Sequence, residues 1–259
     1  MSASGAPQAT PAVHTPDALT ERLTLVERDR SHPPMKVRDA ASLIVLDRSE
    51  PTPKVLMGRR SMRHKFFPGR FVFPGGRVDP TDARVPAAPY TPQTAAKLTA
   101  MLPARYGPAR AHALGIAALR EAYEETGLII GRPGAAQSPR GPAWRAFADA
   151  GLGLDLAPLH FLLRAVTPPG RPRRFDTRFL VVDRTHVAAT DPTVIGDDAE
   201  LEAIHWVPLP DAKALALPTI TLTVLDVLET ELAKPGGLTP GAAVPFFRWR
   251  GRGFVRDLL

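Results

Sequence analysis

The stretch LGIAALREAYEETG occupies residues 114–127 of the chain. Its apolar residues recur at helical spacing, which predicts a helix that ends at Gly127. Residues three and four apart share one face of a helix, so Glu121, Glu124 and Glu125 can point at one place. Carboxylates this close repel one another unless a divalent cation neutralises them, and oxygen ligands favour Mg²⁺ or Mn²⁺. The stretch therefore predicts a metal site; the alternative for such a turn is a solvated helix face.

A glycine pair and a basic segment precede this helix. The sequence FPGG ends a short strand at Gly75 and Gly76, and glycine lets the backbone approach a ligand closely. Residues 54–77 carry seven Lys and Arg side chains, Arg59 and Arg60 among them, and no acidic one. A basic segment followed by a helix with carboxylates suits a metal-bound polyphosphate. The metal ion binds phosphate oxygens, and the arginines neutralise the negative charge that remains on the phosphates.

Together these motifs resemble the Nudix box, whose pattern is G-x5-E-x7-R-E-U-x-E-E-x-G-U with U aliphatic. The match holds at Gly76 and over residues 120–128. Asp82 stands where the family has Glu, Ala122 is small for its position, and the spacer has 37 residues, 83–119, in place of seven. A long insert at this place is known in a branch similar to the mammalian type-19 Nudix hydrolases, which act on coenzyme A and its esters. Three further stretches resemble that branch: residues 67–76, 174–179 and 218–219.

The resemblance implies an α/β fold, a Nudix α/β/α sandwich with a mixed central sheet. It also implies roles for single residues. Glu121, Glu124 and Glu125 would bind Mg²⁺ or Mn²⁺, with a backbone carbonyl of Gly76 as a further ligand, and Arg120 would orient the carboxylates. Asp82 would support them, while Gly75 and Gly76 would position a diphosphate. Water would attack one phosphorus of that diphosphate.

Two candidate groups lie later in the chain. The general base varies within the superfamily, and the acidic residues between 191 and 202 make Glu200 our preferred candidate; the alternative is a solvated loop. A basic cluster between residues 164 and 178 could hold a 3′-phosphate or a pyrophosphate, and from it we select Arg173, Arg174 and Arg178 as substrate-binding residues. The alternative for this cluster is a plain surface loop.

Composition indicates one decorated domain. Among 259 residues there are 29 Pro, 20 Gly and no Cys, which excludes disulfides, Cys-based zinc sites and thiolate nucleophiles. We expect a flexible extension over 1–35, a Nudix domain over 36–234 with an insert at 83–113, and a basic tail over 235–259 that packs on the domain or at a dimer contact. Predicted strands are 37–47, 54–60, 71–73, 159–166, 175–182 and 201–207. Predicted helices are 94–102, 114–126, 143–150 and 218–232, and a short helix is expected around 17–28 within the extension.

We expect a metal-dependent diphosphatase that splits coenzyme A or an acyl-coenzyme A into 3′,5′-ADP and 4′-phosphopantetheine. The alternatives are a Nudix hydrolase of ADP-ribose, an NDP-sugar or capped RNA, and a non-catalytic Nudix-fold protein that binds nucleotides or RNA. The net charge of +7 fits a phosphorylated small molecule as partner. No signal peptide or membrane helix is expected, so we expect a cytoplasmic protein, without a membrane or nucleic acid partner and as a homodimer by analogy.

Overall fold

A mixed sheet forms the centre of the computed structural model, which describes residues 16–25, 32–63, 67–102, 107–134, 141–196 and 199–259. Its strands run in the order β12-β2-β1-β10-β9-β13-β14, with β3 paired to β2 and β4 paired to β1. The pairs β1·β10 and β13·β9 are parallel and the other pairs are antiparallel. The bounds are β1 Arg38–Asp47, β2 Lys54–Arg60, β3 Phe71–Val72, β4 Gly75–Arg77, β9 His160–Val166, β10 Phe175–Asp183, β12 Leu201–Pro208, β13 Pro245–Arg250 and β14 Gly253–Leu258.

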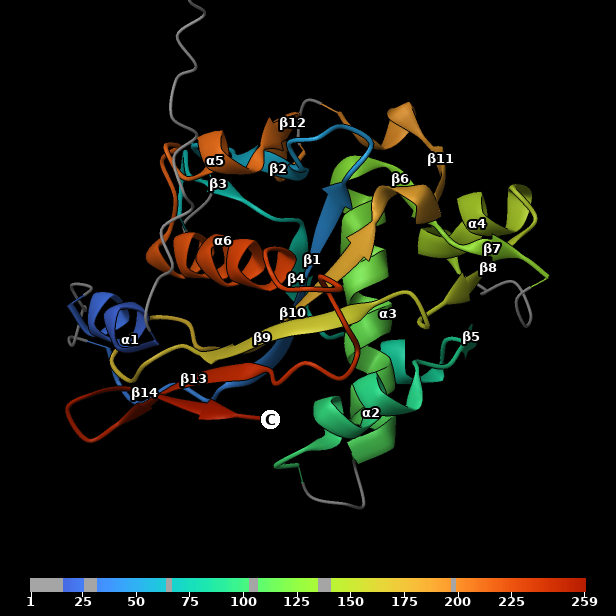
Figure 1. Cartoon of the computed structure of the whole chain (residues 1–259). Coiled ribbons are helices and arrows are strands. Elements are labelled where there is room, and N and C mark those ends of the chain that lie inside the picture. Colours follow the sequence, from blue (N-terminus) through green and yellow to red (C-terminus); the bar gives the residue numbers. More distant parts are fainter. Residues whose placement is uncertain (1–15, 26–31, 64–66, 103–106, 135–140, 197–198) are drawn as a thin grey trace, which may run out of the picture.

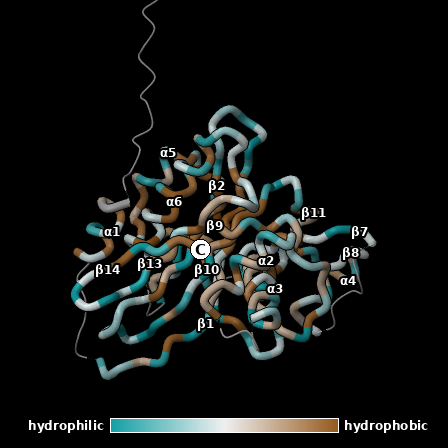
Figure 2. The backbone as a smooth tube through the Cα atoms, turned by 60° about the horizontal axis from the view of Figure 1, so that its bottom comes forward, coloured by the Kyte–Doolittle hydropathy of each residue, from teal (hydrophilic) through white to brown (hydrophobic). Residues whose placement is uncertain are grey.

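Helices cover both faces of this sheet (Figure 1). Helix α3 (Gly107–Thr126), with α2 (Pro92–Thr99) and α4 (Arg145–Asp149), lies on one face, and α6 (Thr219–Leu232), with α1 (Pro16–Leu25) and α5 (Leu209–Ala212), lies on the other. Strand β1 is buried on both faces because Leu43 and Val45 pack towards α3 while Ile44 and Leu46 pack towards α6. Hydrophobic segments accordingly occupy the interior of the molecule (Figure 2). This arrangement is the predicted α/β class with a mixed central sheet.

Short elements complete the α3 side. A two-stranded sheet joins β6 (Leu128–Ile130) to β11 (Val187–Thr190), and a three-stranded one joins β5 (Ala87–Ala88), β8 (Leu152–Asp155) and β7 (Arg132–Pro133). Single 3-10 turns span Asp82–Arg84, Pro142–Trp144, Arg184–His186 and Pro192–Val194. The predicted helix at 143–150 overlaps the 3-10 turn Pro142–Trp144 and helix α4. The short strands were not predicted, because two to four residues carry too little periodicity to be recognised in the sequence.

The insert lies against the first half of α3, away from the Glu-rich turns. Helix α2 begins with Thr91 as its cap, since the Thr91 hydroxyl accepts from the Thr94 N–H, and its Leu98 is 1% exposed. The predicted helix at 114–126 was too short, because α3 begins at Gly107 and takes up the last seven residues of the insert, 107–113. The alanine-rich sequence at 107–113 favours helix, although the apolar spacing that predicts the helix begins only at residue 114.

Both ends of the described chain pack on the domain. Within the stretch that we expected to be flexible, α1 buries Leu19 and Leu23, and its Arg22 pairs with Asp226 of α6 at 2.6 Å; residues 1–15 and 26–31 lie outside the described ranges. The tail forms the hairpin β13–β14, which extends the sheet beyond β9. Among the described residues, none of the helices has the length and apolar character that crossing a membrane requires.

Candidate active site

The Glu-rich turns of α3 lie over strand β4, and the packing of these two elements decides the geometry. The Gly75 N–H donates to Glu125 Oε2 at 2.8 Å. A Cβ at Gly75 would come within 2.6 Å of the Ala41 carbonyl oxygen, and one at Gly76 would overlap the Glu121 carboxylate. Both glycines are therefore needed for the close approach of β4 to β1 and to α3.

Glu125 is the most buried of the three glutamates, with 5% of its surface exposed. Burial raises the pKa of its carboxyl well above the usual range, and the negative charges of Glu200 and Glu121 add to this. The Gly75 N–H and Arg60 act in the opposite direction. Burial likewise raises the pKa of Glu121, against the opposing effect of Arg120. These carboxylates sit close enough to disfavour one another's charge.

Arg120 organises the same turns. Its guanidinium donates to Glu121 at 2.8 Å, to Glu124 at 2.9 Å and to both carboxylate oxygens of Asp82 at 3.1 and 3.2 Å. It also donates to the carbonyl of Arg77, at the end of β4. Asp82 is 1% exposed, so it is an internal anchor for Arg120. Arg120 therefore links Glu121 and Glu124 of α3 to Asp82 and to the end of β4.

Strands β2 and β12 bring Glu200 to this place. The carboxylate of Glu200 pairs with Arg60 at the end of β2, and its carbonyl accepts from the Ser61 N–H at 3.1 Å. Glu202 lies 3.6 Å from Arg59, one pair further along. The sequence selected Arg59, Arg60 and Glu200 separately; their pairing follows from the antiparallel register of β2 and β12. Both arginines face carboxylates in this structure.

The donor set suits a hard divalent ion in its chemistry. Glu121 and Glu125 are carboxylates whose burial and mutual repulsion disfavour their charge, and a cation removes both penalties. Within the described ranges, however, no three His, Cys, Asp or Glu side chains already stand together as a metal-binding group. Arg120 holds Glu121 and Glu124, and Gly75 holds Glu125. An ion would have to displace these partners or bind the second oxygen of each carboxylate.

The second basic cluster is mostly internal, which corrects the role predicted for Arg178. Arg178 is fully buried and pairs with Asp39 and Asp176 at 3.0 Å, and Arg164 pairs with Asp176 at 2.8 Å. Alternation along β9 and β10 turns both arginines inward, where they neutralise buried carboxylates and cannot reach a substrate. Arg174 donates to the carbonyls of Thr167 and Met35, so it ties the chain together. Only Arg173 is exposed.

A tether between α3 and the loop before β12 escaped the sequence prediction. The Tyr123 hydroxyl donates to Asp191 Oδ2 at 3.0 Å, and the Asp191 N–H donates to the Gly127 carbonyl at 2.8 Å. Gly127 has φ 71°, a left-handed conformation that favours glycine. Asp191 stood in the predicted acidic cluster, but its partner Tyr123 occupies a position of the box where any residue is allowed, so no sequence signal pointed to it.

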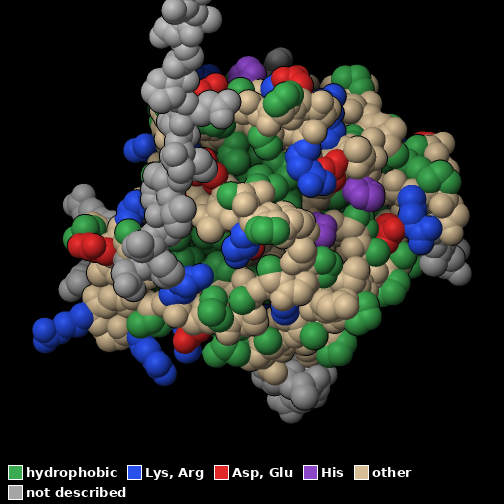
Figure 3. Space-filling model, viewed as in Figure 1, with side chains coloured by type: hydrophobic (Ala, Val, Ile, Leu, Met, Phe, Trp, Pro, Cys, Tyr) green, Lys and Arg blue, Asp and Glu red, His purple; other side chains and the backbone are tan. Residues whose placement is uncertain are grey.

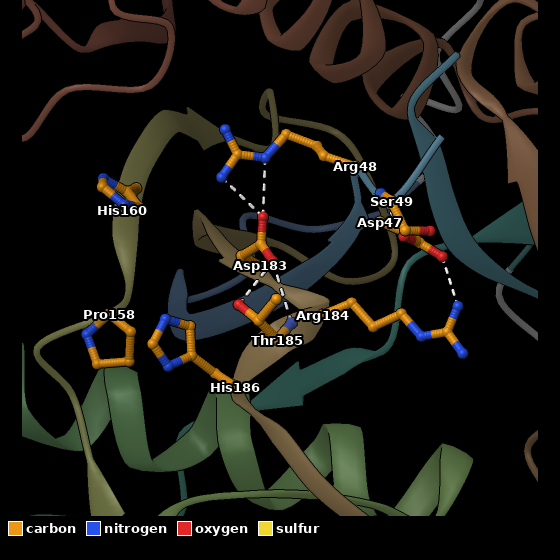
Figure 4. Close-up of a pocket in the computed structure, with 9 residues that line it drawn as sticks. All are labelled: Asp47, Arg48, Ser49, Pro158, His160, Asp183, Arg184, Thr185 and His186. Carbon is orange, nitrogen blue, oxygen red and sulfur yellow. Dashed lines mark hydrogen bonds and ion pairs between the residues drawn. The ribbon is translucent and has the colours of Figure 1, made fainter. Parts of the chain in front are cut away.

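A pocket of about 910 Å³ opens at the far ends of β1 and β10 (Figure 4). Its charges are paired within its own wall: Arg48 with Asp183 at 2.7 Å, and Arg184 with Asp47. His160 and His186 also line it. No residue selected from the sequence lines this pocket, and the Glu-rich turns of α3 contribute nothing to it.

Comparisons with known proteins identify the family of the chain. No protein-family model matches the chain. The crystal structure of a Nudix hydrolase from Alicyclobacillus acidocaldarius shares 31% sequence identity with it, over 74% of this chain and 90% of that one, with a TM-score of 0.54. A Caenorhabditis elegans protein named nudix hydrolase 7 is 26% identical over 182 residues, which are 66% of this chain. The chain spans about half the length of this curated relative. The first similarity, together with the box over Gly76 and Arg120–Leu128, shows that the chain belongs to the Nudix hydrolases, a family of pyrophosphatases that use divalent metal ions.

Proposed function

We propose that this protein is a metal-dependent diphosphatase that hydrolyses a nucleoside-diphosphate-linked substrate. The observation that carries the proposal is the packing of Glu121 and Glu125 against Gly75 and Gly76 of β4. Glu124 shares Arg120 with Glu121, and Glu200 lies close enough to raise the pKa of Glu125. So many acidic groups in a half-buried place are costly without a cation. A divalent metal ion bound to a diphosphate would supply that cation.

Glu121, Glu124 and Glu125 would hold the ion, for which we propose Mg²⁺ or Mn²⁺. When bound, a divalent ion lowers the pKa of an attacking water and neutralises charge on the diphosphate oxygens. The chain's own groups do the rest. Arg120 keeps Glu121 and Glu124 on one side of the helix, and the Gly75 N–H fixes one oxygen of Glu125, leaving the other for a ligand.

Glu200 is the proposed proton acceptor for the attacking water. Its side chain is 40% exposed, so water reaches it, and it lies close enough to Glu125 to raise the pKa of that group. Arg60 holds the Glu200 carboxylate from the β2 side. Since Arg60 is 14% exposed and basic, it is also placed to meet a phosphate oxygen of a bound substrate.

Coenzyme A or an acyl-coenzyme A is the substrate we propose first, with 3′,5′-ADP and 4′-phosphopantetheine as products. Its support is the resemblance of residues 67–76 and of the insert to the coenzyme A branch. The internal pairing of Arg178 removes one residue from the predicted 3′-phosphate site and leaves Arg173 as its exposed member. ADP-ribose, an NDP-sugar and capped RNA remain the alternatives with the same chemistry. The cytoplasmic location and the homodimer stay predictions.

A panel of diphosphates tests the proposal. We expect Mg²⁺- or Mn²⁺-dependent hydrolysis to two phosphorylated products of at least one compound among coenzyme A, its 3′-dephospho form, ADP-ribose, an NDP-sugar and capped RNA. Glu124→Gln and Glu125→Gln should each lower kcat about 100-fold or more, because each removes a ligand of the ion. Glu200→Gln should lower kcat with little change in KM.

Glu202→Gln is the matched control for Glu200, because both side chains are 40% exposed and each pairs with an arginine of β2. It should leave kcat within about threefold of the wild type. If no diphosphate is turned over with either ion, the enzyme proposal fails and the non-catalytic binding protein takes its place. If Arg173→Ala does not change the preference for coenzyme A over its 3′-dephospho form, Arg173 does not bind the 3′-phosphate.

A further inference from the structure

Five exposed basic side chains gather at one end of the central sheet. They are Lys36, Arg38, Arg173, Arg250 and Arg252, which we call the basic edge. In sequence they belong to three separate segments more than 70 residues apart. In Figure 3 basic side chains project from the molecule where the β13–β14 hairpin turns.

Strand direction brings these segments together. Because β1 and β10 are parallel, Arg38 at the start of β1 pairs with Phe175 at the start of β10, two residues after Arg173. Because β9 and β13 are parallel, the turn that follows β9 and the turn that follows β13 lie at the same end of the sheet. That end also holds the starts of β1 and β10, since β9 and β10 are antiparallel (Figure 1). Arg250 and Arg252 therefore lie beside the turn that carries Arg173.

The charge of the basic edge is not balanced within the described chain. None of its five members makes an ion pair with another described residue. The nearby carboxylates of Asp39 and Asp176 are already shared by inward-facing arginines. Glu21 on α1, which packs against β14, is an exposed carboxylate on this side. The surplus is positive and open to solvent.

The shape of the basic edge selects an extended ligand. From β1 to β13 it crosses three strand spacings, roughly 15 Å at the usual distance between strands. Its side chains lie on turns and strand ends, and none of them lines the pocket at the ends of β1 and β10. A single small phosphate would meet one or two of these cations, whereas a polyanion that runs along the edge would meet most of them.

Two aromatic rings lie beside the arginines. Trp249 and Phe254 pair across β13 and β14 with ring centroids 5.6 Å apart and planes at 89°. The Trp249 indole N–H donates to the Gly251 carbonyl, so the ring lies over the turn between Arg250 and Arg252. Both aromatic residues are partly exposed. Arginine next to partly exposed aromatic rings suits phosphates joined to bases, because guanidinium groups bind phosphate and rings stack on bases.

We propose that the basic edge binds single-stranded RNA. This goes against our expectation from the sequence, in which the tail and the 164–178 cluster were weighed as separate features. The parallel pairing of β9 and β13 merges them into one surface. The basic edge shares Arg173 with the 3′-phosphate site proposed above, whereas Arg250 and Arg252 have no part in that site or in the carboxylates of α3. Substitutions at Arg250 and Arg252 therefore test RNA binding independently of diphosphate hydrolysis.

The test measures binding of a fluorescent oligouridine of about 20 nucleotides to the full chain by anisotropy, over a salt series. We expect binding at about 50 mM salt that weakens steeply as salt rises. The double variant Arg250→Glu/Arg252→Glu should weaken binding about tenfold or more at that salt. It should also reduce the slope of log K against log salt by roughly 1.4, which is two contacts at about 0.7 each.

The matched control is Arg84→Glu/Arg145→Glu, because both are exposed arginines outside the basic edge and the change in net charge is the same. It should weaken RNA binding less than threefold. An equal loss in both double variants, or no binding of the wild type at about 50 mM salt, overturns the proposal. Binding to vesicles that contain phosphatidylserine without binding to RNA would replace RNA by a membrane surface. Turnover of a small diphosphate should be unchanged in Arg250→Glu/Arg252→Glu, so a failure here leaves the diphosphatase proposal standing.

Discussion

Among single residues, Glu125 carries a buried carboxylate that lowers the stability of the fold and that the proposed metal site requires. Its carboxylate is 5% exposed and is stabilised by one backbone N–H, with Glu121 and Glu200 nearby. A neutral side chain of the same shape would fit this place with less cost, because burial disfavours the charged form. The position therefore keeps a carboxylate that the fold alone does not need.

Glu125→Gln should raise the unfolding midpoint of metal-free protein at neutral pH while it abolishes turnover. The folded-state pKa of Glu125 is raised, so the stabilising protonated form is present at low pH and is lost as the pH rises through that folded value. The stability advantage of the glutamine variant should therefore grow from pH 5 to pH 8. Thermal unfolding in a chelator at both pH values checks this, and a variant that is less stable at pH 8 would contradict it.

Asp47 shows the opposite shift. The hydrogen bonds from Ser49, with help from Arg184, lower the pKa of its carboxyl to about 2. A lowered pKa stabilises the fold above the usual aspartate value, and this contribution is lost as the pH falls towards 2. Asp47→Asn should cost about 1 kcal/mol at pH 7, a figure reduced for solvent screening because Arg184 is half exposed. Urea unfolding at pH 7 and pH 3 should show the difference shrinking at the lower pH; a constant difference would mean that packing causes the loss.

At the scale of elements, helix α3 has two halves with different tasks. Its first half packs against the insert: a Cβ at Gly115 would overlap the Tyr90 ring, and α2 lies alongside. Its last turns carry Arg120 and the three glutamates next to β4. The described parts of the insert, residues 83–102 and 107–113, therefore support the helix from the end away from the carboxylates and do not cover them.

Leu98→Ala separates these two tasks. Leu98 of α2 is 1% exposed, and its truncation should lower the free energy of unfolding by about 3 kcal/mol through loss of burial and a residual cavity. KM for the diphosphate substrate should stay within about twofold, because the insert does not reach the carboxylates. Met101→Ala, at a side chain that is 57% exposed, is the control with little expected loss. A large rise in KM for Leu98→Ala would show that the insert shapes the substrate site.

At the scale of the whole molecule, two hydrophobic layers enclose the sheet, and the N-terminal helix belongs to one of them. Leu19 and Leu23 are 5% and 4% exposed in the layer with α6, and Thr24 accepts from the Phe254 N–H of strand β14. Helix α1 thus packs against α6 and the last hairpin at once. It is part of the domain, although the sequence around it is rich in polar residues.

Leu19→Ala/Leu23→Ala should lower the free energy of unfolding by about 4 kcal/mol or more, because both side chains leave the layer on α6. Leu25→Ala is the control on the same helix, since Leu25 is 76% exposed, and it should change stability by less than about 0.5 kcal/mol. Chemical denaturation of the three proteins gives the comparison. Equal stability of the double variant and the control would mean that α1 does not contribute to the folded domain.

Local patterns were enough for the elements that carry strong periodicity. The strands around Ile44, Leu56, Leu163 and Val181 and the helix at residues 219–232 lie where the sequence placed them, because their apolar runs are bounded by turn-forming residues. The α/β class was implied by the resemblance to a known family. The Nudix family followed from Gly76 and the box around Arg120, and the comparisons bear it out.

Only the tertiary structure decided which charges meet. Arg178 and Arg173 look alike in sequence, yet one is buried between Asp39 and Asp176 and the other is exposed. Glu200 meets Arg60, 140 residues away, through the register of β2 and β12, and the turns after β9 and β13 meet through a parallel pairing. The sequence by itself therefore determined the elements, the motif and the family, because those depend on neighbours within a few residues. Burial and partners of the charged side chains depend on strand order and register, which link residues far apart along the chain.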